Sequence, residues 1–143
     1  MEKERPFGFT LIELLVTVAI LTILAAVAYP TYISYLARGH RTDAKTVLLD
    51  DAQFLERNFT LSNKYNKDSA GANISLPYTQ APKSGTAVYT VSATTLTATT
   101  FTLTAVPVAG GPMASDDCGS FTYDQQGIQG VSGGLGVDTC WNK

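Results

Sequence analysis

The feature that most constrains this chain is an apolar run from Phe9 to Tyr29, FTLIELLVTVAILTILAAVAY, in which Glu13 is the only charged side chain. A helix over this run would be roughly 30 Å long, which matches the hydrocarbon core of a bilayer. Charged residues return abruptly between positions 38 and 45. The sequence therefore predicts that residues 9–29 lie in an apolar environment, and that water-facing structure begins after them.

Two general kinds of segment fit this run. A cleaved secretory signal would use Ala26-Val27-Ala28 as its small-x-small site, although the run is long for such a signal and holds an acid. A plain membrane anchor accounts for the length. It leaves Glu13 to reach the headgroups from near the helix end, because a carboxylate at the bilayer centre costs about 2.5 to 3.5 kcal/mol. Basic residues flank both sides of the run, so they do not decide its orientation.

The start of the run carries a more specific pattern. A short leader, MEKERPFG, ends in Gly8; Phe9 follows, and Glu13 is the fifth residue after the glycine. This string resembles a type IV prepilin, and the likeness extends through AAVAYPTYISYLARGHRTDA to about Leu61. The resemblance implies that a prepilin peptidase cuts after Gly8 and that Phe9 becomes the N-methylated first residue. The leader is less cationic than many in the family, because two glutamates stand beside its basic residues.

The resemblance also implies a role for Glu13 in assembly. Cleavage before Phe9 creates an ammonium group in apolar surroundings, where a charge needs a partner. When subunits stack in a fibre, we expect Glu13 of one subunit to lie beside the Phe9 ammonium of a neighbour and to set the register of incoming subunits. The main expected partners are therefore other pilin subunits, in a homo- or hetero-filament, contacted through the N-terminal helix.

Pro30 either ends the membrane helix or kinks one longer helix. Helical periodicity resumes beyond it and favours the kink, because apolar residues recur on one face at Ile33, Ala37, Ala44, Leu48, Ala52, Leu55 and Phe59. The charged residues Asp43, Asp50, Asp51, Glu56 and Arg57 are assigned to the other faces. The prediction is one helix over residues 9–61, about 80 Å long, with an apolar part at 9–29 and an amphipathic part at 30–61 that packs on a sheet.

A basic cluster lies in the amphipathic part and comprises Arg38, His40, Arg41 and Lys45. We interpret it as a solvated face or as a contact with lipid headgroups. The alternative is DNA contact, as in some pilin-like uptake proteins. The formal net charge of −2 and the pI of about 5.2 give no overall basic excess of the kind that attracts nucleic acid.

The part of the chain after the helix predicts a small antiparallel sheet. Residues 62–85 lack a helical or alternating pattern and read as a long ordered loop. Strands are expected at 87–93, 100–106, 120–124 and 128–131, where apolar and polar residues alternate or short β-rich runs occur. The fold class is therefore α+β, with a long N-terminal helix on three or four antiparallel strands, and the resemblance implies that this is the type IV pilin fold. The threonines between residues 94 and 100 could alternatively be glycosylated.

Cys118 and Cys140 enclose a glycine-rich stretch. Outside the inner membrane they should form a disulfide, whereas two cysteines and one distant histidine do not make a zinc site. The segment from Asp116 to Trp141 also resembles the C-terminal disulfide loop of small minor pilins. The expected organisation is a leader at 1–8, the helix at 9–61 and a globular head at 62–143.

The residues give no sign of an enzyme. His40 is the only histidine, no serine lies beside a plausible base, and no glycine loop of the phosphate-binding kind occurs. The adjacent acids Asp116 and Asp117 could bind calcium, as in pseudopilins of secretion systems, but such pairs are more often turns. We therefore expect no catalytic residue, no metal and no cofactor.

The resemblance implies a structural subunit of a type IV pilus, first of all a minor pilin that enters or primes a filament used in adhesion, twitching motility or DNA uptake. The alternatives are a major pilin, a type II secretion pseudopilin, a DNA-binding uptake pilin and a simple membrane anchor for a periplasmic head. The expected location is the inner membrane with a periplasmic head, then the extracellular pilus. DNA or a surface receptor is a further candidate partner.

Overall fold

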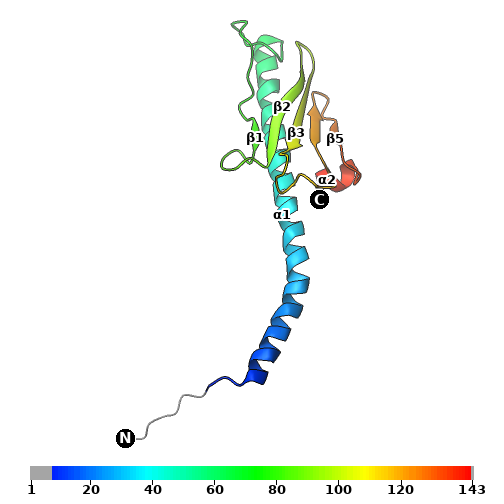
Figure 1. Cartoon of the computed structure of the whole chain (residues 1–143). Coiled ribbons are helices and arrows are strands. Elements are labelled where there is room, and N and C mark those ends of the chain that lie inside the picture. The colour runs from blue at the N-terminus through cyan, green and yellow to red at the C-terminus, as the bar shows by residue number, and fades with distance from the viewer. Residues whose placement is uncertain (1–7, 143) are drawn as a thin grey trace, which may run out of the picture. The chain divides into compact units, whose positions relative to one another are not determined.

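The computed structural model describes residues 8–142, so the predicted leader, apart from Gly8, lies outside the described residues. The chain divides between Leu36 and Ala37 into two compact units. Its elements in order are α1 (Leu11–Ser62), β1 (Gln80–Ala81), β2 (Tyr89–Leu96), β3 (Phe101–Pro107), β4 (Phe121–Asp124), β5 (Gln129–Val131) and α2 (Val137–Asn142) (Figure 1). The predicted α+β class is confirmed: one long helix accompanies an antiparallel sheet and a disulfide.

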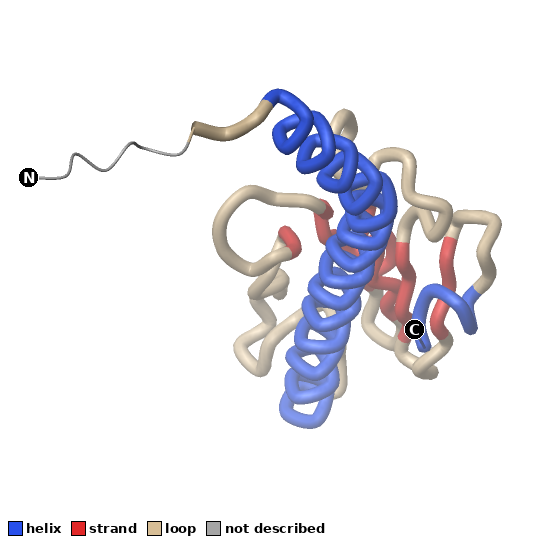
Figure 2. The backbone as a smooth tube through the Cα atoms, turned by 90° about the horizontal axis from the view of Figure 1, so that it is seen from below, coloured by secondary structure: helices blue, strands red, loops and turns tan. Residues whose placement is uncertain are grey.

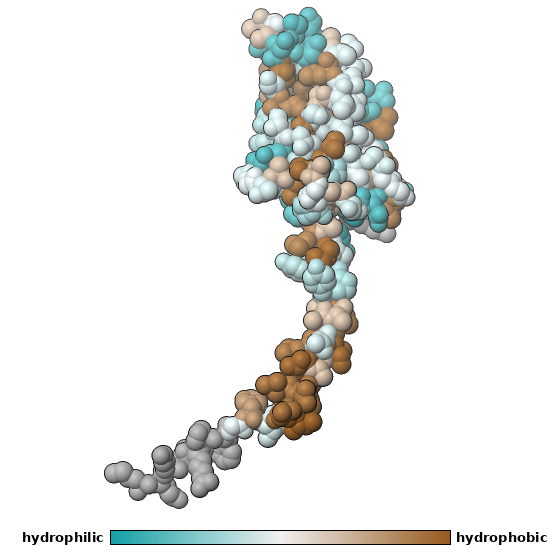
Figure 3. Space-filling view, in the orientation of Figure 1, coloured by the Kyte–Doolittle hydropathy of each residue, from teal (hydrophilic) through white to brown (hydrophobic). Residues whose placement is uncertain are grey.

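The first unit holds the apolar part of α1. Every described residue from Gly8 to Leu36 is exposed, and brown apolar side chains cover much of this helical segment (Figure 3). By length and composition this helix is able to cross a membrane. The helix does not end at Pro30, although proline cannot donate the backbone hydrogen bond that Ala26 would accept. Whether it bends there during assembly stays a prediction.

The second unit, residues 37–142 as described, is called the globular unit below. Its part of α1 buries one stripe at helical spacing, which comprises Ala44, Val47, Leu48, Asp51, Ala52, Leu55 and Asn58. The predicted apolar face is confirmed from Ala44 to Leu55, whereas Ile33 is exposed. The assignment of Asp51 to a polar face was wrong, because this side chain is fully buried.

The sheet has five strands in the order β1-β2-β3-β4-β5, all antiparallel. All four expected strands are present with shifted ends, and β2 reaches Leu96 through a bulge between Ala93 and Thr95. The additional strand, β1, lies inside the segment expected to be a loop. Its two residues, Gln80 and Ala81, pair with β2, and so short an element leaves no period in the sequence to detect.

The core lies between the buried stripe of α1 and one face of the sheet. Strand residues at alternate positions supply it, namely Tyr89, Val91, Phe101, Leu103, Ala105 and Phe121. The ring of Phe121 packs edge-to-face on both Tyr89 and Trp141, at centroid distances of 6.0 and 5.8 Å. The short helix α2, absent from the sequence prediction, thus joins the core through Trp141. Figure 2 shows the sheet strands against the globular part of α1.

Candidate functional site

The start of α1 is closed by reciprocal hydrogen bonds between Thr10 and Glu13. The backbone N–H and the hydroxyl of Thr10 both donate to Glu13 Oε2 at 3.2 Å, and the Glu13 N–H donates to Thr10 Oγ1 at 3.3 Å. This is a capping box, which satisfies backbone donors that the first helical turn leaves without partners. Sequence reasoning missed this role, although the Thr-x-x-Glu spacing at positions 10–13 is its signal.

The carboxylate of Glu13 therefore has a partner in a single chain. Its second oxygen, Oε1, makes no hydrogen bond to any described residue. One carboxylate has the capacity to accept both the capping bonds and an additional cation. The local geometry accordingly leaves one carboxylate oxygen available for the assembly role of Glu13, which stays a prediction.

Hydroxyl groups within the apolar segment donate back to the helix itself. Thr17 Oγ1 donates to the Leu14 carbonyl at 2.9 Å, and Thr22 Oγ1 donates to the Ala19 carbonyl at 2.8 Å. Polar hydrogens without partners are costly in hydrocarbon, so this pattern suits a helix surrounded by lipid or by other apolar helices.

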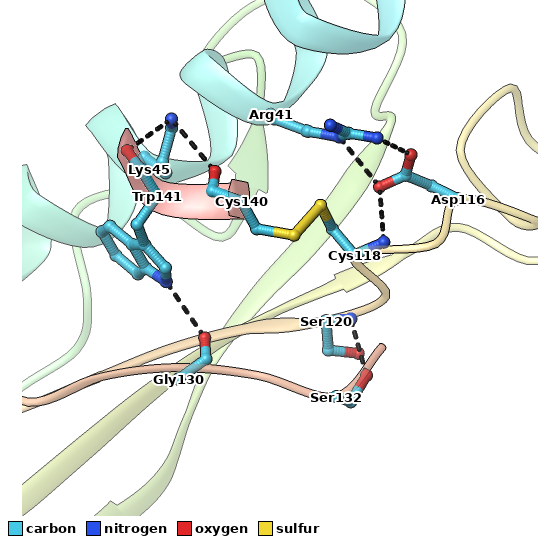
Figure 4. The surroundings of a disulfide bond; sticks show 9 residues. All are labelled: Arg41, Lys45, Asp116, Cys118, Ser120, Gly130, Ser132, Cys140 and Trp141. Carbon is cyan, nitrogen blue, oxygen red and sulfur yellow. Dashed lines mark hydrogen bonds and ion pairs between the residues drawn. A yellow bond between two sulfur atoms is a disulfide. The ribbon is translucent and has the colours of Figure 1, made fainter. Parts of the chain in front are cut away.

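In the globular unit, Arg41 holds the segment that leads into the disulfide (Figure 4). Its Nη2 lies 2.5 Å from Asp116 Oδ1, and its Nε lies 3.1 Å from Asp116 Oδ2. The two side chains are only 15% and 6% exposed. Asp116 Oδ2 also accepts the Cys118 N–H at 3.3 Å. The hydrogen bond to Asp116 raises the pKa of Arg41, so this guanidinium stays charged.

We call residues 116–141 the C-terminal segment. Arg41 holds its first residue, and Lys45, one helical turn further along α1, holds its last two. Its Nζ donates to the carbonyls of Cys140 and Trp141 at 3.3 and 3.0 Å. These are carbonyls of the last turn of α2, where a cation is favourable. Burial lowers the pKa of Lys45. Trp141 Nε1 in turn donates to the Gly130 carbonyl at 3.1 Å, which joins α2 to β5.

The disulfide between Cys118 and Cys140 is present, and both cysteines are fully buried (Figure 4). The disulfide closes residues 118–140 into a loop, and Arg41 and Lys45 fasten the two ends of that loop to α1. The interpretation of the basic cluster as a solvated face was therefore wrong for Arg41 and Lys45, which are bonded within the globular unit. Arg38, another member of the cluster, is exposed. The spacing of Arg41 and Lys45 places them on one helix face, but their partners 75 to 96 residues away could not be read from the sequence.

Asp51 is a second feature that the sequence did not reveal. Its Oδ1 accepts the Tyr78 N–H at 3.2 Å and so fixes the segment before β1 to α1. Its Oδ2 is buried without a hydrogen-bond partner among the described residues. Burial raises the pKa of Asp51 to about 6; Asp50 adds to this shift, while the Tyr78 hydrogen bond and Lys83 oppose it.

A groove of about 500 Å³ borders α1 on the side of β1. Phe54 and Tyr78 contribute its aromatic walls, and each ring carries a cation. Arg57 Cζ lies 5.7 Å from the Phe54 ring centroid, and Lys83 Nζ lies 4.3 Å from that of Tyr78. Lys83 also pairs with Asp50.

The predicted processing residues lie ahead of the helix. Gly8 and Phe9 are exposed and non-helical, with Phe9 81% exposed. Among residues 8–142 no group of three His, Cys, Asp or Glu side chains is placed to hold a metal ion.

Two family models together match most of the chain. A model described as "Prokaryotic N-terminal methylation motif" matches residues 5–29. A model described as "Type IV minor pilin ComP, DNA uptake sequence receptor" matches residues 30–122.

Individual pilins are also similar to this chain in sequence or in structure. The type IV major pilin protein PilA of Myxococcus xanthus is 52% identical over 46 residues, which are 32% of this chain and 21% of PilA. The type IV wide pilus major component PilA4 of Thermus thermophilus is 37% identical over 89 residues, which are 62% of this chain and 67% of PilA4. The chain thus spans about a fifth of the first relative and two thirds of the second. The solved structure of the Neisseria meningitidis non-core minor pilin PilV has the same fold, with a TM-score of 0.50, 20% identity, and coverage of 71% of this chain and 92% of that chain.

Proposed function

This chain belongs to the type IV pilin family, and on that premise we propose that it enters a pilus as a minor subunit after leader removal and N-methylation of Phe9. The observation that carries the proposal is the segment of residues 9–36. All of it is exposed, most of it is apolar, and Glu13 is its only acid. A helix with this surface needs lipid or other helices around it, so it serves first as an anchor and then as a fibre core.

Cleavage after Gly8 by a prepilin peptidase is the first step of the proposed route. The exposed and non-helical backbone of residues 8–10 supports it, because a peptidase binds extended chain more readily than helix. The new ammonium group of Phe9 then requires a counter-charge in the apolar fibre core. Glu13 of a neighbouring subunit supplies it, and the free Oε1 described above is the acceptor.

The minor role is favoured by the match of residues 30–122 to a family described as a minor pilin. Abundance tests it: a minor subunit is expected at a small fraction of the major pilin in sheared fibres, whereas equal or greater abundance would make it the major pilin. Absence from fibres together with a secretion defect on deletion would instead mark a type II secretion pseudopilin.

DNA binding is a second candidate function, and the family description "DNA uptake sequence receptor" favours it. Arg41 and Lys45 are engaged within the globular unit, which leaves the exposed Arg38 of the predicted cluster and the cations Arg57 and Lys64 for phosphate contacts. The purified full chain in detergent would then retard duplex DNA with an affinity that falls steeply with salt. An affinity for DNA that does not change with salt concentration, or no retardation of the DNA at all, would contradict this function.

Intact mass and N-terminal sequencing of the chain from its host test the main proposal. A species that begins with N-methyl-Phe9 and appears in sheared fibres is the expected result. A species that begins at Tyr29 would indicate ordinary secretion, and one that keeps Met1 would indicate an unprocessed anchor.

A further inference from the structure

Three tyrosines stand close together at the end of the apolar segment of α1. Tyr29, Tyr32 and Tyr35 lie within the first unit and are 71%, 59% and 69% exposed. The preceding residues, from Phe9 to Ala28, include no tyrosine or tryptophan. Side chains three apart on a helix form one ridge of its surface, so the three rings follow one another over roughly 9 Å of helix rise. We call these three residues the tyrosine band.

The hydroxyl groups of the first unit differ in whether the helix itself satisfies them. The serine and threonine hydroxyls inside the helix donate to its carbonyls at 2.8 to 3.1 Å, and they belong to Thr17, Thr22, Thr31 and Ser34. The hydroxyls of the tyrosine band make no hydrogen bond to any described residue, although Thr31 and Ser34 alternate with them along the chain. A hydroxyl without a partner is costly in hydrocarbon. The tyrosine band therefore needs polar surroundings, whereas the serine and threonine hydroxyls do not.

The length of α1 before the tyrosine band matches the thickness of a hydrocarbon core. From Leu11 to Tyr29 the helix rises roughly 27 Å, and the hydrocarbon core of a bilayer is about 30 Å thick. Residues 8–10 precede the helix as non-helical chain. A helix that keeps the tyrosine band in one headgroup layer thus brings the bond between Gly8 and Phe9 to the other.

We propose that the tyrosine band binds the lipid headgroup layer, sets the depth of α1 in the membrane before assembly, and so holds the Gly8–Phe9 bond at the opposite interface. Tyrosine suits this layer because its ring is apolar while its hydroxyl reaches water and headgroup oxygens. Anchoring side chains of this kind decide how a helix sits in a bilayer, which the length of an apolar run does not. This inference rests on the proposed function and names the headgroup layer as the partner of the tyrosine band.

Depth measurements on the full chain in vesicles of phosphatidylethanolamine and phosphatidylglycerol test the contact. Ile33→Cys and Ile20→Cys each carry one nitroxide label, since Cys118 and Cys140 are paired and do not react. The label at position 33 should be relaxed mainly by a water-soluble nickel chelate. The label at position 20 should be relaxed mainly by oxygen, which concentrates in hydrocarbon. If the label at position 33 also responds mainly to oxygen, the tyrosine band does not lie in the headgroup layer and the inference is wrong.

Variants of the band show whether its hydroxyls select this depth. Combining Tyr29→Leu, Tyr32→Leu and Tyr35→Leu should lower the nickel accessibility of the label at position 33 about threefold, because the end of the apolar segment then enters the lipid. Phenylalanine at all three positions keeps the rings without the hydroxyls and should also lower it. Thr31→Val with Ser34→Ala is the matched control, since it removes hydroxyls that bond only to the helix, and should change nothing. Equal accessibility with tyrosine and with phenylalanine would overturn the proposal and assign the rings to contacts between chains.

Leader removal separates this inference from the proposed function. In the same vesicles, purified prepilin peptidase should cut the wild-type chain after Gly8. It should cut the triple leucine variant about threefold more slowly, because the Gly8–Phe9 bond is no longer held at the interface. Equal rates in the two forms would contradict the depth-setting role. If the wild type stays uncut while its labels report the expected depths, the proposed processing fails and the lipid contact of the tyrosine band stands.

Discussion

Arg41 and Asp116, 75 residues apart in sequence, form a two-pronged ion pair that ties α1 to the residues leading into Cys118. Because both side chains are largely buried, the surviving charge cannot recover its hydration if one partner is removed. The pair therefore contributes to holding the C-terminal segment on the helix, beside the contacts of Lys45 with α2.

We expect Arg41→Ala to lower the free energy of unfolding by about 3 kcal/mol, because Asp116 would be left as a buried charge. Arg41→Lys should recover part of this loss, since lysine keeps the charge without the two-pronged geometry. Urea unfolding of the full chain in detergent measures both effects. Arg38→Ala, which removes an exposed arginine one turn away, is the matched control, and an equal effect at both positions would refute the structural role of Arg41.

The disulfide closes a loop with a sequence separation of 22 residues, and its loss should cost about 3 kcal/mol in the chain-entropy picture. We expect the same loss for the double variant Cys118→Ala and Cys140→Ala and for the reduced wild type. Trp141, the only tryptophan, reports the change locally because it is nearly buried beside Cys140. Its fluorescence should shift to longer wavelength at lower urea concentration; an unchanged unfolding midpoint would contradict this.

Asp51 should make the globular unit less stable as the pH rises. The pKa of Asp51 is about 6 in the fold against an ordinary value of 3.8, so between these pH values the folded chain holds a proton that the unfolded chain has released. Raising the pH through this window lowers the free energy of unfolding, by at most about 3 kcal/mol.

The variant Asp51→Asn removes this titration while its side-chain oxygen still accepts the Tyr78 N–H. The difference in unfolding free energy between variant and wild type should therefore grow in favour of the variant from pH 4 to pH 7. Asp138→Asn, at an exposed position, controls for the loss of one carboxylate. A constant difference across this range would show that the burial of Asp51 is not linked to proton binding.

The capping box allows the two roles of Glu13 to be separated. Glu13→Gln keeps the hydrogen bonds to Thr10 but removes the charge, whereas Thr10→Ala weakens the cap and keeps the charge. If the ion pair with Phe9 registers incoming subunits, Glu13→Gln and Glu13→Val should both be processed normally yet be depleted from sheared fibres. Thr10→Ala should still enter them. Immunoblots of membrane and fibre fractions measure this, and normal incorporation of Glu13→Gln would dismiss the ion pair.

The features that follow from short-range patterns were predicted well. Helical spacing gave four of the buried positions between Ala44 and Leu55 but not Val47 or Asp51, and alternation gave four of the five strands. β1, α2 and the burial of Asp51 were missed. A two-residue strand and a six-residue helix exist because of what they pack against, and one acid within an amphipathic helix carries no sign of which side it faces.

The sequence by itself determined the apolar helix, the processing pattern around Gly8 and the two cysteines, because each depends on residues close together in the chain or on composition alone. Only the tertiary structure decided that Arg41 and Lys45 hold the disulfide segment, and that the buried Asp51 accepts the N–H of Tyr78. These relationships join residues far apart in sequence, and the partner of a charge depends on how the chain folds back rather than on its neighbours along the chain.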